Sequence, residues 1–599
     1  MSQAPSAQRA WAFAVPSLVP PAMLVAGMLA LSLLRGTGLD RQRAAFVDCA
    51  GCFVSMALHA DLALVALALA LCAASGWMMH PPAARTRVQR VIVFAALGAL
   101  LVAITVDIGL SATLGHRLLW ADVRQYGRET GAIVDIALPY LQTPHGALAG
   151  AALLIAFAGL AATLFGRWRL RPSLAPAVVS LAAAAAAAGA LRTPGFSYFD
   201  AAVVGNVVAI QRLDSGLRHH SDEMAGALRA LPEPPRHCHP LVASAAPRTI
   251  IVVVLESWSL HHSRLFSGLG DRTPRLDRWA ERGRWFPEFV ANSYSTEAAL
   301  IALLNGSVPI PSHRSWGALA FREVDGDFHR WLASRGWHTH FATSGALHFG
   351  DREAVLRQLG IASIEGAEHP AYAGRPRGAF DAASDRALVD RVLHWYDHER
   401  PDRPAMATVL TVGTHPPFID AEPHDPHRPG EAAAVQRMDE AVDRLLSELE
   451  ARGAMADGTV VVLGDHRAMT PITRDEVRRF GESSTSRVPA FALGVGADGG
   501  RTPGAFQQTD LIPSLRALLE GEDCRTDWQG RFLGPAPRPA DVVVYAHPVL
   551  RNELRVQMAG NTYRLRLDGD DTGWVGDVPP GGEAVLREAM RQRLSRDQP

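Results

Sequence analysis

The chain contains 599 residues, which corresponds to roughly three or four domain equivalents and excludes a single small binding module. Its 59 basic residues, all of them arginine, nearly balance 60 acidic residues, and this net charge of −1 argues against a nucleic-acid-binding protein. Five cysteines exclude a disulfide-rich scaffold. The mean hydropathy of +0.05 lies between the values of a soluble enzyme and a membrane bundle, which indicates two unlike parts.

The N-terminal part carries apolar runs of the length that a membrane span needs, about 20 residues. We expect five spans within a membrane domain of residues 1–195. The first run contains Pro16, Pro20 and Pro21, and a cleaved signal peptide is the alternative explanation of that run. The predicted spans cover residues 11–34, 53–79, 91–114, 147–165 and 174–191.

The distribution of arginine predicts the orientation of these spans. The short connections 80–90 and 166–171 each hold three arginines and no acidic residue, whereas the connections 35–48 and 115–146 mix both charges. By the positive-inside rule the first pair is cytoplasmic, so the N-terminus is also cytoplasmic. Five spans then place everything after residue 191 outside the cytoplasm.

Three ionisable residues fall inside the predicted spans: His59, Asp61 and Asp107. Charge within a membrane is costly, so a functional role is one interpretation. The other is that these residues face water or lipid headgroups and only tie the helices together.

Residues 196–247 read as a linker, with an amphipathic stretch at 201–217 and a Pro-rich run, LPEPPRHCHP. The pattern then changes to apolar runs typical of buried parallel strands, separated by helical patterns. This alternation predicts a doubly wound α/β domain over residues 248–540. The expected strands are 249–257, 338–344, 405–413, 458–466 and 488–496, and the expected helices include 274–283, 327–335, 380–400 and 432–454.

Residues 541–599 differ again, with short alternating runs that predict an antiparallel β-rich subdomain. A closing helix is expected near residues 582–594.

Ionisable side chains follow several of the predicted strands. Glu256 ends the first strand, His415 follows the strand of 405–413, and Asp465 with His466 ends the strand of 458–466. Because ligands of open α/β sheets bind beyond the carboxyl ends of the strands, these groups form a candidate metal site. Singly, each residue has the simpler reading of a turn or helix cap.

A candidate nucleophile lies in the segment NSYSTEAALIALLNG, residues 292–306. Ser295 or Thr296 would sit at the N-terminus of a helix, where free N–H groups and the helix dipole favour an anion. The alternative is that either residue serves only as the helix N-cap.

The motifs VLESW, TPRLDRWAERG, STEAALIALLNG, THPPF, LGDH and QTDLIPSL together resemble the alkaline phosphatase superfamily. Within it, the chain resembles the sulfatase-fold transferases of bacterial envelopes, the lipoteichoic acid synthases and membrane phosphoglycerol transferases. The layout of five N-terminal spans and an outer catalytic domain is similar too. This resemblance implies a multi-pass protein of the bacterial inner (cytoplasmic) membrane.

The resemblance also implies roles for particular residues. Thr296 would be the nucleophile and, with Glu256, Asp465 and His466, would hold one divalent ion, manganese or zinc, with magnesium as a third option. His415 and Arg352 would contact the substrate. Around Arg352 the chain reads SGALHFGDR, where lipoteichoic acid synthases tend to have an aspartate and a tryptophan, so the headgroup is open.

The implied activity is transfer of a phosphoglycerol-type headgroup from a membrane phospholipid to a hydroxyl of an envelope glycan or polymer, through a phosphothreonine intermediate. The alternatives are a phosphoethanolamine transferase, a phosphodiester hydrolase of the same fold, or a catalytically silent scaffold. Phosphoethanolamine transferases that modify lipid A typically carry several disulfides, whereas Cys238 and Cys524 allow at most one bridge in this domain. Cys49 and Cys52 form a further possible pair.

Overall fold

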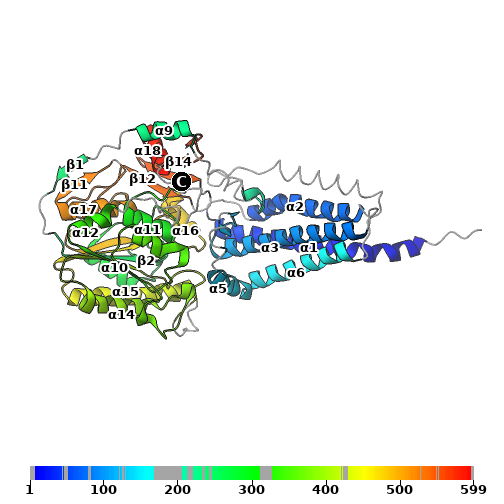
Figure 1. Ribbon diagram of the computed structural model, residues 1–599, viewed down its shortest axis with the longest axis horizontal. Coiled ribbons are helices and arrows are strands. Elements are labelled where there is room, and N and C mark those ends of the chain that lie inside the picture. The colour runs from blue at the N-terminus through cyan, green and yellow to red at the C-terminus, as the bar shows by residue number, and fades with distance from the viewer. Residues whose placement is uncertain are drawn as a thin grey trace, which may run out of the picture. The chain divides into compact units, whose positions relative to one another are not determined.

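The structure is a computed structural model (Figure 1). It describes residues 7–43, 45, 51–77, 83–120, 122–123, 127, 130–166, 205–211, 220–231, 237–241, 246–310, 327–419, 421, 430–526, 528–547, 550 and 552–594. The chain divides into two compact units, one drawn mainly from residues before 213 and the other mainly from residues after it.

The first unit is helical. Among its described residues, four helices are long and apolar enough to cross a membrane, over Val19–Arg41, Cys52–Ala74, Arg87–Thr113 and Pro144–Phe165. They match the first four predicted spans, and the predicted span 174–191 lies outside the described residues. The helices of this unit are α1 (Ala7–Arg43), α2 (Cys52–Trp77), α3 (Ala83–Thr113), α5 (Thr130–Gln142) and α6 (Pro144–Phe165).

Glycines allow α1 and α6 to pack closely. A Cβ atom on Gly27 would lie 2.7 Å from the Cβ of Ala156, and one on Gly159 would lie 2.4 Å from the backbone nitrogen of Leu24. Close approach through small residues is a common way for membrane helices to associate, because it maximises van der Waals contact.

Among the described residues of this helical unit, two ion pairs are buried. Arg35 lies 3.0 Å from Asp61, and Arg117 lies 2.8 Å from Asp107. Both arginines also donate to the carbonyl oxygen of Gly205, over 2.8 and 2.9 Å. Asp61 and Asp107 therefore tie parts of this unit together, but they are buried and do not face water or headgroups as the second sequence interpretation expected.

His59, the third predicted intramembrane group, has a different environment. It is exposed, and its Nδ1 lies 3.1 Å from the carbonyl oxygen of Ser55, one helical turn earlier. It takes no part in the two buried ion pairs.

The second unit is built on a seven-stranded sheet in the order β3-β9-β8-β2-β7-β5-β6. The central strand β2 pairs in parallel with β7 and β8, and β5 pairs in parallel with β7 and β6. The strands are β2 (Thr249–Leu255), β3 (Arg284–Trp285), β5 (His338–Thr343), β6 (Ser363–Glu365), β7 (Ala405–Leu410), β8 (Gly458–Gly464) and β9 (Ala490–Gly494).

One edge of this sheet differs from the predicted parallel arrangement. Strand β9 runs antiparallel to β8, and β3 runs antiparallel to β9, so the sheet is mixed. The chain leaves β8 at its carboxyl end and stays at that end through α16 (Arg474–Phe480). It therefore enters β9 from the same end and runs back. An apolar run such as 488–496 shows that a strand is buried, but it does not reveal the strand's direction.

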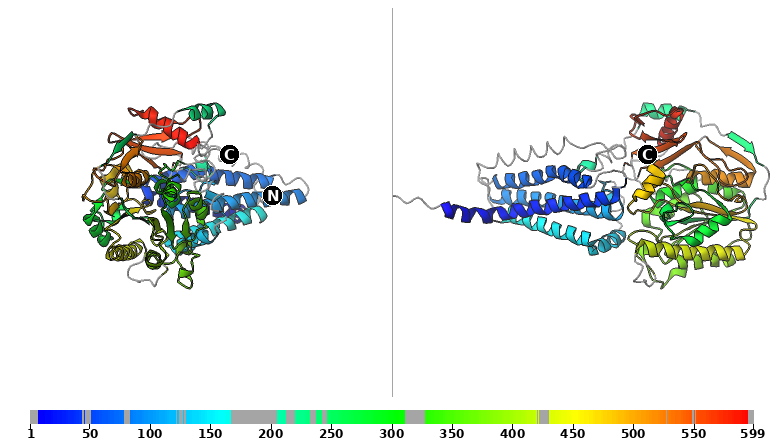
Figure 2. Two further views of the ribbon diagram at one scale, coloured as in Figure 1. Left: turned by 60° about the vertical axis from the view of Figure 1, so that its left-hand side comes forward. Right: turned by 180° about the vertical axis from the view of Figure 1, so that it is seen from behind.

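Helices cover both faces of the sheet (Figures 1 and 2). Alternate residues of β2 contribute to two separate hydrophobic cores, Ile250, Val252 and Val254 to one and Ile251, Val253 and Leu255 to the other. The first core includes residues of α11 (Thr296–Asn305), α12 (Asp327–Ser334), α13 (Arg352–Gln358) and α17 (Leu511–Glu520). The second includes residues of α10 (Pro274–Arg282), α14 (Asp385–His394) and α15 (Glu431–Ala451).

The predicted β-rich C-terminal part is confirmed. Four antiparallel strands, β12 (Val542–Ala546), β13 (Glu553–Met558), β14 (Asn561–Arg566) and β15 (Gly573–Val575), are followed by α18 (Gly582–Leu594). A short parallel pair, β4 (Phe289–Val290) with β10 (Phe506–Gln507), forms a separate two-stranded sheet.

The segment predicted as a linker contains folded pieces. Helix α9 (Asp222–Ala230) packs against α18 through a small apolar cluster that includes Leu228 and Met590 (Figure 2). Strand β1 (His237–Pro240) pairs with β11 (Glu522–Arg525), and a disulfide joins Cys238 to Cys524. Cys49 of the other predicted pair lies outside the described residues.

Candidate metal and nucleophile site

The site forms where β2 and β8 end side by side. The register pairs Leu255 with Gly464, so Glu256 and Asp465, the next residues along each strand, leave the sheet at neighbouring positions. The backbone nitrogen of Glu256 donates to the Thr411 hydroxyl over 2.9 Å, which ties it to the end of β7. Parallel strands thus bring together groups that are more than 200 residues apart in the chain.

Ser257 orients both carboxylates. Its backbone nitrogen donates to Asp465 Oδ1 over 2.7 Å, and its hydroxyl donates to Glu256 Oε1 over 2.8 Å. Its φ of 56° lies in the left-handed region, which is uncommon for a residue other than glycine. Such a backbone is typical of functional turns, where the surrounding structure holds a strained residue in place.

Thr296 begins helix α11 and points its hydroxyl at the acidic cluster. Its Oγ1 donates to Glu256 Oε2 over 2.8 Å and lies 3.3 Å from His466 Nε2. Ser295, the rival candidate, is the N-cap residue of the helix, and among the described residues its side chain makes no capping hydrogen bond. The structure therefore brings Thr296, rather than Ser295, into the cluster.

The residues present fit a divalent cation. Ligand atoms of Glu256, Asp465 and His466 all lie within 4.8 Å of one another, and all three side chains are buried. Asp465 Oδ2 is buried without a hydrogen-bond partner among the described residues, so it has an unused acceptor aimed into the cluster. With the Thr296 oxygen, these groups give four donors of the kinds that zinc and manganese accept.

The tautomer of His466 also suits a metal. Its Nδ1 lies 2.9 Å from the carbonyl oxygen of Arg467, so Nδ1 carries the proton and donates. Nε2, the nitrogen left to bind a metal, then faces Glu256 and Asp465, at 3.4 and 3.3 Å. Histidines that bind metals usually donate their other N–H in this way, which fixes the ring.

The electrostatics of the cluster favour a cation. Burial and the neighbouring charge of Glu256 raise the pKa of Asp465 to about 7. Burial would also raise the pKa of Glu256, but His466 and His415 outweigh it and lower that pKa. For His466, burial opposes the charged form, yet Asp465 and Glu256 raise its pKa above the ordinary value. Two buried carboxylates side by side thus create a demand for positive charge.

His415 follows β7 and is half-buried on the loop that ends near Glu256. The hydroxyl of Thr414, the preceding residue, donates to the carbonyl oxygen of Glu256. The His415 ring packs edge-on against Phe380 with 4.5 Å between ring centroids, and its Nδ1 is close to the carbonyl oxygen of Pro416. Burial lowers the pKa of His415, which favours the neutral ring.

Arg352 forms an ion pair with Glu297, the residue that follows the candidate nucleophile Thr296. It is the first residue of α13, and its guanidinium Nη2 lies 3.6 Å from Oε1 of Glu297, which directly follows Thr296. The predicted substrate arginine is therefore held beside α11 by an ion pair.

Several supporting residues were not singled out from the sequence. Gln508 donates to the carbonyl oxygens of Gly464 and Asp465, over 3.1 and 2.6 Å, and so fixes the end of β8. Gln508 is the first residue of the QTDLIPSL motif, which was recognised in the sequence without a role for this side chain. Ser257 and Thr411 stand beside predicted strand ends, where ordinary turn residues are also common.

Comparison with known proteins agrees with this fold. Residues 248–521 match the sulfatase family model. Among curated proteins, none matches the chain. Residues 248–521 of the second unit thus form a sulfatase-family domain, and the acidic cluster lies within it. In the part of the chain that the structure describes, four helices long and apolar enough to cross a membrane precede this domain.

Three similar solved structures are distant from this chain in sequence. One is a protein of the alkaline phosphatase superfamily from Vibrio parahaemolyticus, with 17% identity, a TM-score of 0.45, and coverage of 64% of this chain and 95% of that one. A second is the lipoteichoic acid synthase LtaP from Listeria monocytogenes, with 15% identity, a TM-score of 0.42, and coverage of 62% and 96%. A third is the C-terminal periplasmic domain of EcEptC from Escherichia coli, with 15% identity, a TM-score of 0.35, and coverage of 53% and 94%.

Proposed function

We propose that the protein transfers a phosphoglycerol-type headgroup from a membrane phospholipid to a hydroxyl of an envelope glycan or polymer. The observation that carries this proposal is the Thr296 hydroxyl, placed at the start of α11 and within 2.8 Å of Glu256 in a buried acidic cluster. Threonine is a weak nucleophile at its ordinary pKa, so it needs such a site to react.

The chain's own residues support a two-step reaction. In the first step the Thr296 oxygen attacks the phosphodiester phosphorus, and the bond from phosphorus to the diacylglycerol oxygen breaks. The Thr296 hydroxyl loses its proton, and the released diacylglycerol oxygen takes up one proton. Free N–H groups in the first turn of α11 would face the phosphate oxygens and stabilise their charge. A divalent ion held by Glu256, Asp465, His466 and the Thr296 oxygen would polarise the phosphate and lower the pKa of the hydroxyl.

In the second step an acceptor hydroxyl attacks the phosphothreonine and releases Thr296. The acceptor loses a proton and the Thr296 oxygen regains one. We assign the movement of this proton to His415, because its neutral ring lies on the loop bonded to Glu256 and has Nε2 free of the Pro416 contact. Arg352 would contact the headgroup from the α11 side.

The membrane helices and the disulfide support the proposed location. Four apolar helices keep the site in the same membrane as its lipid donor, which raises the effective donor concentration. The Cys238–Cys524 bridge is typical of an oxidising compartment. Together with the arginine distribution, this supports a cytoplasmic N-terminus and a catalytic domain on the outer face of the bacterial inner membrane.

Mass spectrometry of the peptide that contains Thr296 tests the proposal. The full-length protein is incubated with phosphatidylglycerol or phosphatidylethanolamine and then quenched in acid. We expect a phosphoglycerol adduct on Thr296 with the first lipid, whose mass identifies the headgroup. A phosphoethanolamine adduct that forms only with the second lipid would show that phosphatidylethanolamine, and not phosphatidylglycerol, is the donor. Diacylglycerol release without any adduct on Thr296 would contradict the phosphothreonine step.

A further inference from the structure

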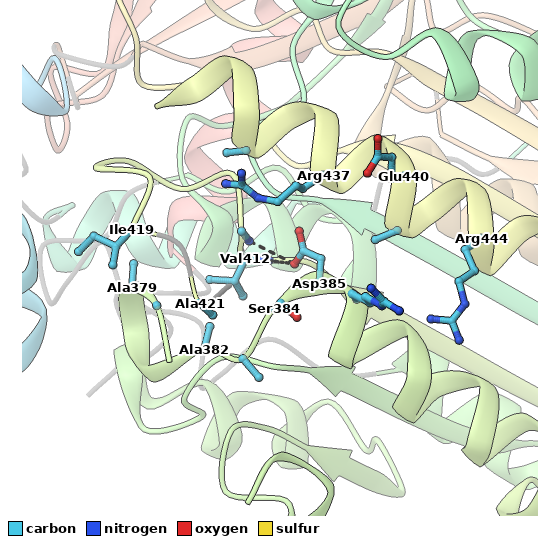
Figure 3. Close-up of a pocket in the computed structure, with 16 residues that line it drawn as sticks. Ala379, Ala382, Ser384, Asp385, Val412, Ile419, Ala421, Arg437, Glu440 and Arg444 are labelled. Carbon is cyan, nitrogen blue, oxygen red and sulfur yellow. Dashed lines mark hydrogen bonds between the residues drawn. The ribbon is translucent and has the colours of Figure 1, made fainter. Parts of the chain in front are cut away.

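A cavity of about 250 Å³ lies on the α14–α15 side of the sheet, outside the cluster described above (Figure 3). Its walls come from the segment 378–386, from residues 412, 413, 419 and 421, and from residues 434–444 of α15. Small residues leave the space open, since Ala379, Ala382, Ala383, Ala434 and Ala441 all line it. This volume suits a small polar molecule or one sugar unit better than a lipid chain.

The floor of the cavity is a buried carboxylate. Asp385 is 7% exposed, and its Oδ1 accepts hydrogen bonds from the backbone nitrogens of Val412 and Gly413, over 3.1 and 3.2 Å. A Cβ atom at position 413 would lie 2.7 Å from Asp385 Oδ2. Glycine at 413 therefore keeps a side chain away from the second carboxylate oxygen, which remains an acceptor at the cavity floor.

The rim of the cavity is rich in guanidinium groups. Arg386, Arg437 and Arg444 line it together with Glu440, and Figure 3 shows Arg437 above Asp385. Arg444 is held by Asp390 at 2.7 Å, so its charge is already balanced.

A carboxylate floor under arginines suits a ligand that both donates and accepts hydrogen bonds. Hydroxyl groups do both, so a sugar or another polyol can donate to Asp385 and accept from an arginine. A phosphate group only accepts, and it would meet the negative charges of Asp385 and Glu440. The lining therefore favours a neutral polyol over an anion.

The cavity shares a loop with the catalytic cluster. Val412, Gly413 and Ile419 face the cavity, whereas Thr414 on the same loop donates to the carbonyl oxygen of Glu256. On the opposite wall, Ala379 lines the cavity and Phe380, the next residue, packs against His415. The loop that carries His415 thus links the cavity to the cluster around Glu256.

We propose that this cavity is a subsite for the acceptor and binds one sugar or polyol unit of it. The proposal rests on the transferase function above. The bound unit would position a hydroxyl further along the acceptor near His415. That hydroxyl oxygen forms a bond to phosphorus, the bond from phosphorus to the Thr296 oxygen breaks, and the hydroxyl proton passes through His415 to the Thr296 oxygen.

The first test measures the ratio of two reactions of the phosphothreonine intermediate, transfer to the acceptor and hydrolysis by water. Full-length protein in lipid nanodiscs receives labelled phosphatidylglycerol and, as acceptor probe, a short linear β-glucan of glucose. Ala434→Leu fills the cavity and Arg437→Gln removes a rim donor, and each should lower the ratio of transfer to hydrolysis by about tenfold. Ala432→Leu, on the same helix but outside the cavity lining, is the matched control and should keep the wild-type ratio.

The second test measures binding without turnover. Saturation-transfer NMR with the same β-glucan should show contact with the wild-type protein and with Ala432→Leu, and a loss of that contact in Ala434→Leu and Arg437→Gln. Glucan binding that persists in both cavity variants, or an unchanged transfer ratio, would overturn the subsite. Inorganic phosphate that competes with the glucan would overturn the polyol assignment.

The two proposals fail in different ways. If the wild-type protein releases no diacylglycerol, the transferase function is wrong, while the NMR result still decides whether the cavity binds a sugar. If diacylglycerol is released and the ratio is unchanged in both cavity variants, only the subsite is wrong.

Discussion

The hydroxyl of Thr296 donates a hydrogen bond to Glu256 Oε2 over 2.8 Å, although the two residues are 40 positions apart in the chain. One comes from the start of a helix and the other from the end of the central strand. Their contact means that the fold itself orients the proposed nucleophile and the proposed metal-binding carboxylate.

Substitution of Thr296 should separate its role from that of its neighbour. We expect Thr296→Ala to lower diacylglycerol release by about 10³-fold or more, because no other group replaces a lost nucleophile. Thr296→Ser keeps an oxygen and should retain part of the activity. Ser295→Ala is the matched control, and a loss of activity in that variant comparable to Thr296→Ala would show that the two residues were assigned the wrong way round.

Removal of divalent ions should destabilise the catalytic unit. Binding of an ion to the folded state alone at 100 times its Kd stabilises by about 2.7 kcal/mol. After chelation we expect Tm to fall, and we expect re-addition of manganese or zinc to restore it. Asp465→Asn weakens the donor set and should abolish most of this response. A wild-type Tm that is unaffected by chelation and by added ions would argue against the metal site.

We expect the stabilising effects of the buried residues Arg117 and Asp107 to depend on each other. Three hydrogen bonds link the two side chains, over 2.9, 3.1 and 2.8 Å. Asp107→Leu leaves a buried guanidinium without its carboxylate, and such losses cost about 3–5 kcal/mol. The double variant with Arg117→Met should recover part of this loss, as measured by thermal denaturation in detergent. If the stability loss of the double variant equals the sum of the two single losses, the two residues do not stabilise the protein as a pair.

His340 should make the stability of the catalytic unit sensitive to acid. The residue is buried on β5, its ring stacks on Trp395 with 4.4 Å between centroids, and burial lowers its pKa from 6.5 to about 3. The unfolded chain therefore binds a proton that the folded protein excludes, and stability is lost as the pH falls below 6.5.

The expected loss from His340 is about 1.4 kcal/mol at one pH unit below the unfolded pKa. His340→Phe keeps the stacking but cannot take up a proton, so its Tm should depend less on pH between 7.5 and 5.5, a window of about two units. The exposed His348→Phe is the control and should leave the pH dependence unchanged. Identical slopes in wild type and His340→Phe would rule out this residue as the source.

The architecture and the cluster could both be predicted from strand patterns. Apolar runs ending in Glu256 and in Asp465–His466 predicted strand ends, and parallel strands share an edge where such ends meet. The choice between Ser295 and Thr296 could not be made in this way, because both residues suit a helix start. It depends on the rotation of α11, which its packing in the hydrophobic core determines.

Other features depend on contacts between distant segments and leave no local signal. The direction of β9 follows from the path of residues 465–489, and the apolar pattern is the same for either direction. The pairing of Asp61 with Arg35 depends on how α1 and α2 pack, so the sequence showed only that a charge was buried. The cavity above Asp385 is made by small residues from three segments, each unremarkable alone.

The seven-stranded sheet ends on both sides in very short strands. Strand β3 pairs over two residues and β6 over three, whereas the central β2 pairs with β8 over seven. An unpaired strand edge is a template for another chain, and a short edge offers few N–H and C=O groups for that pairing. The short edges of this sheet therefore leave little backbone on which another chain could aggregate edge to edge.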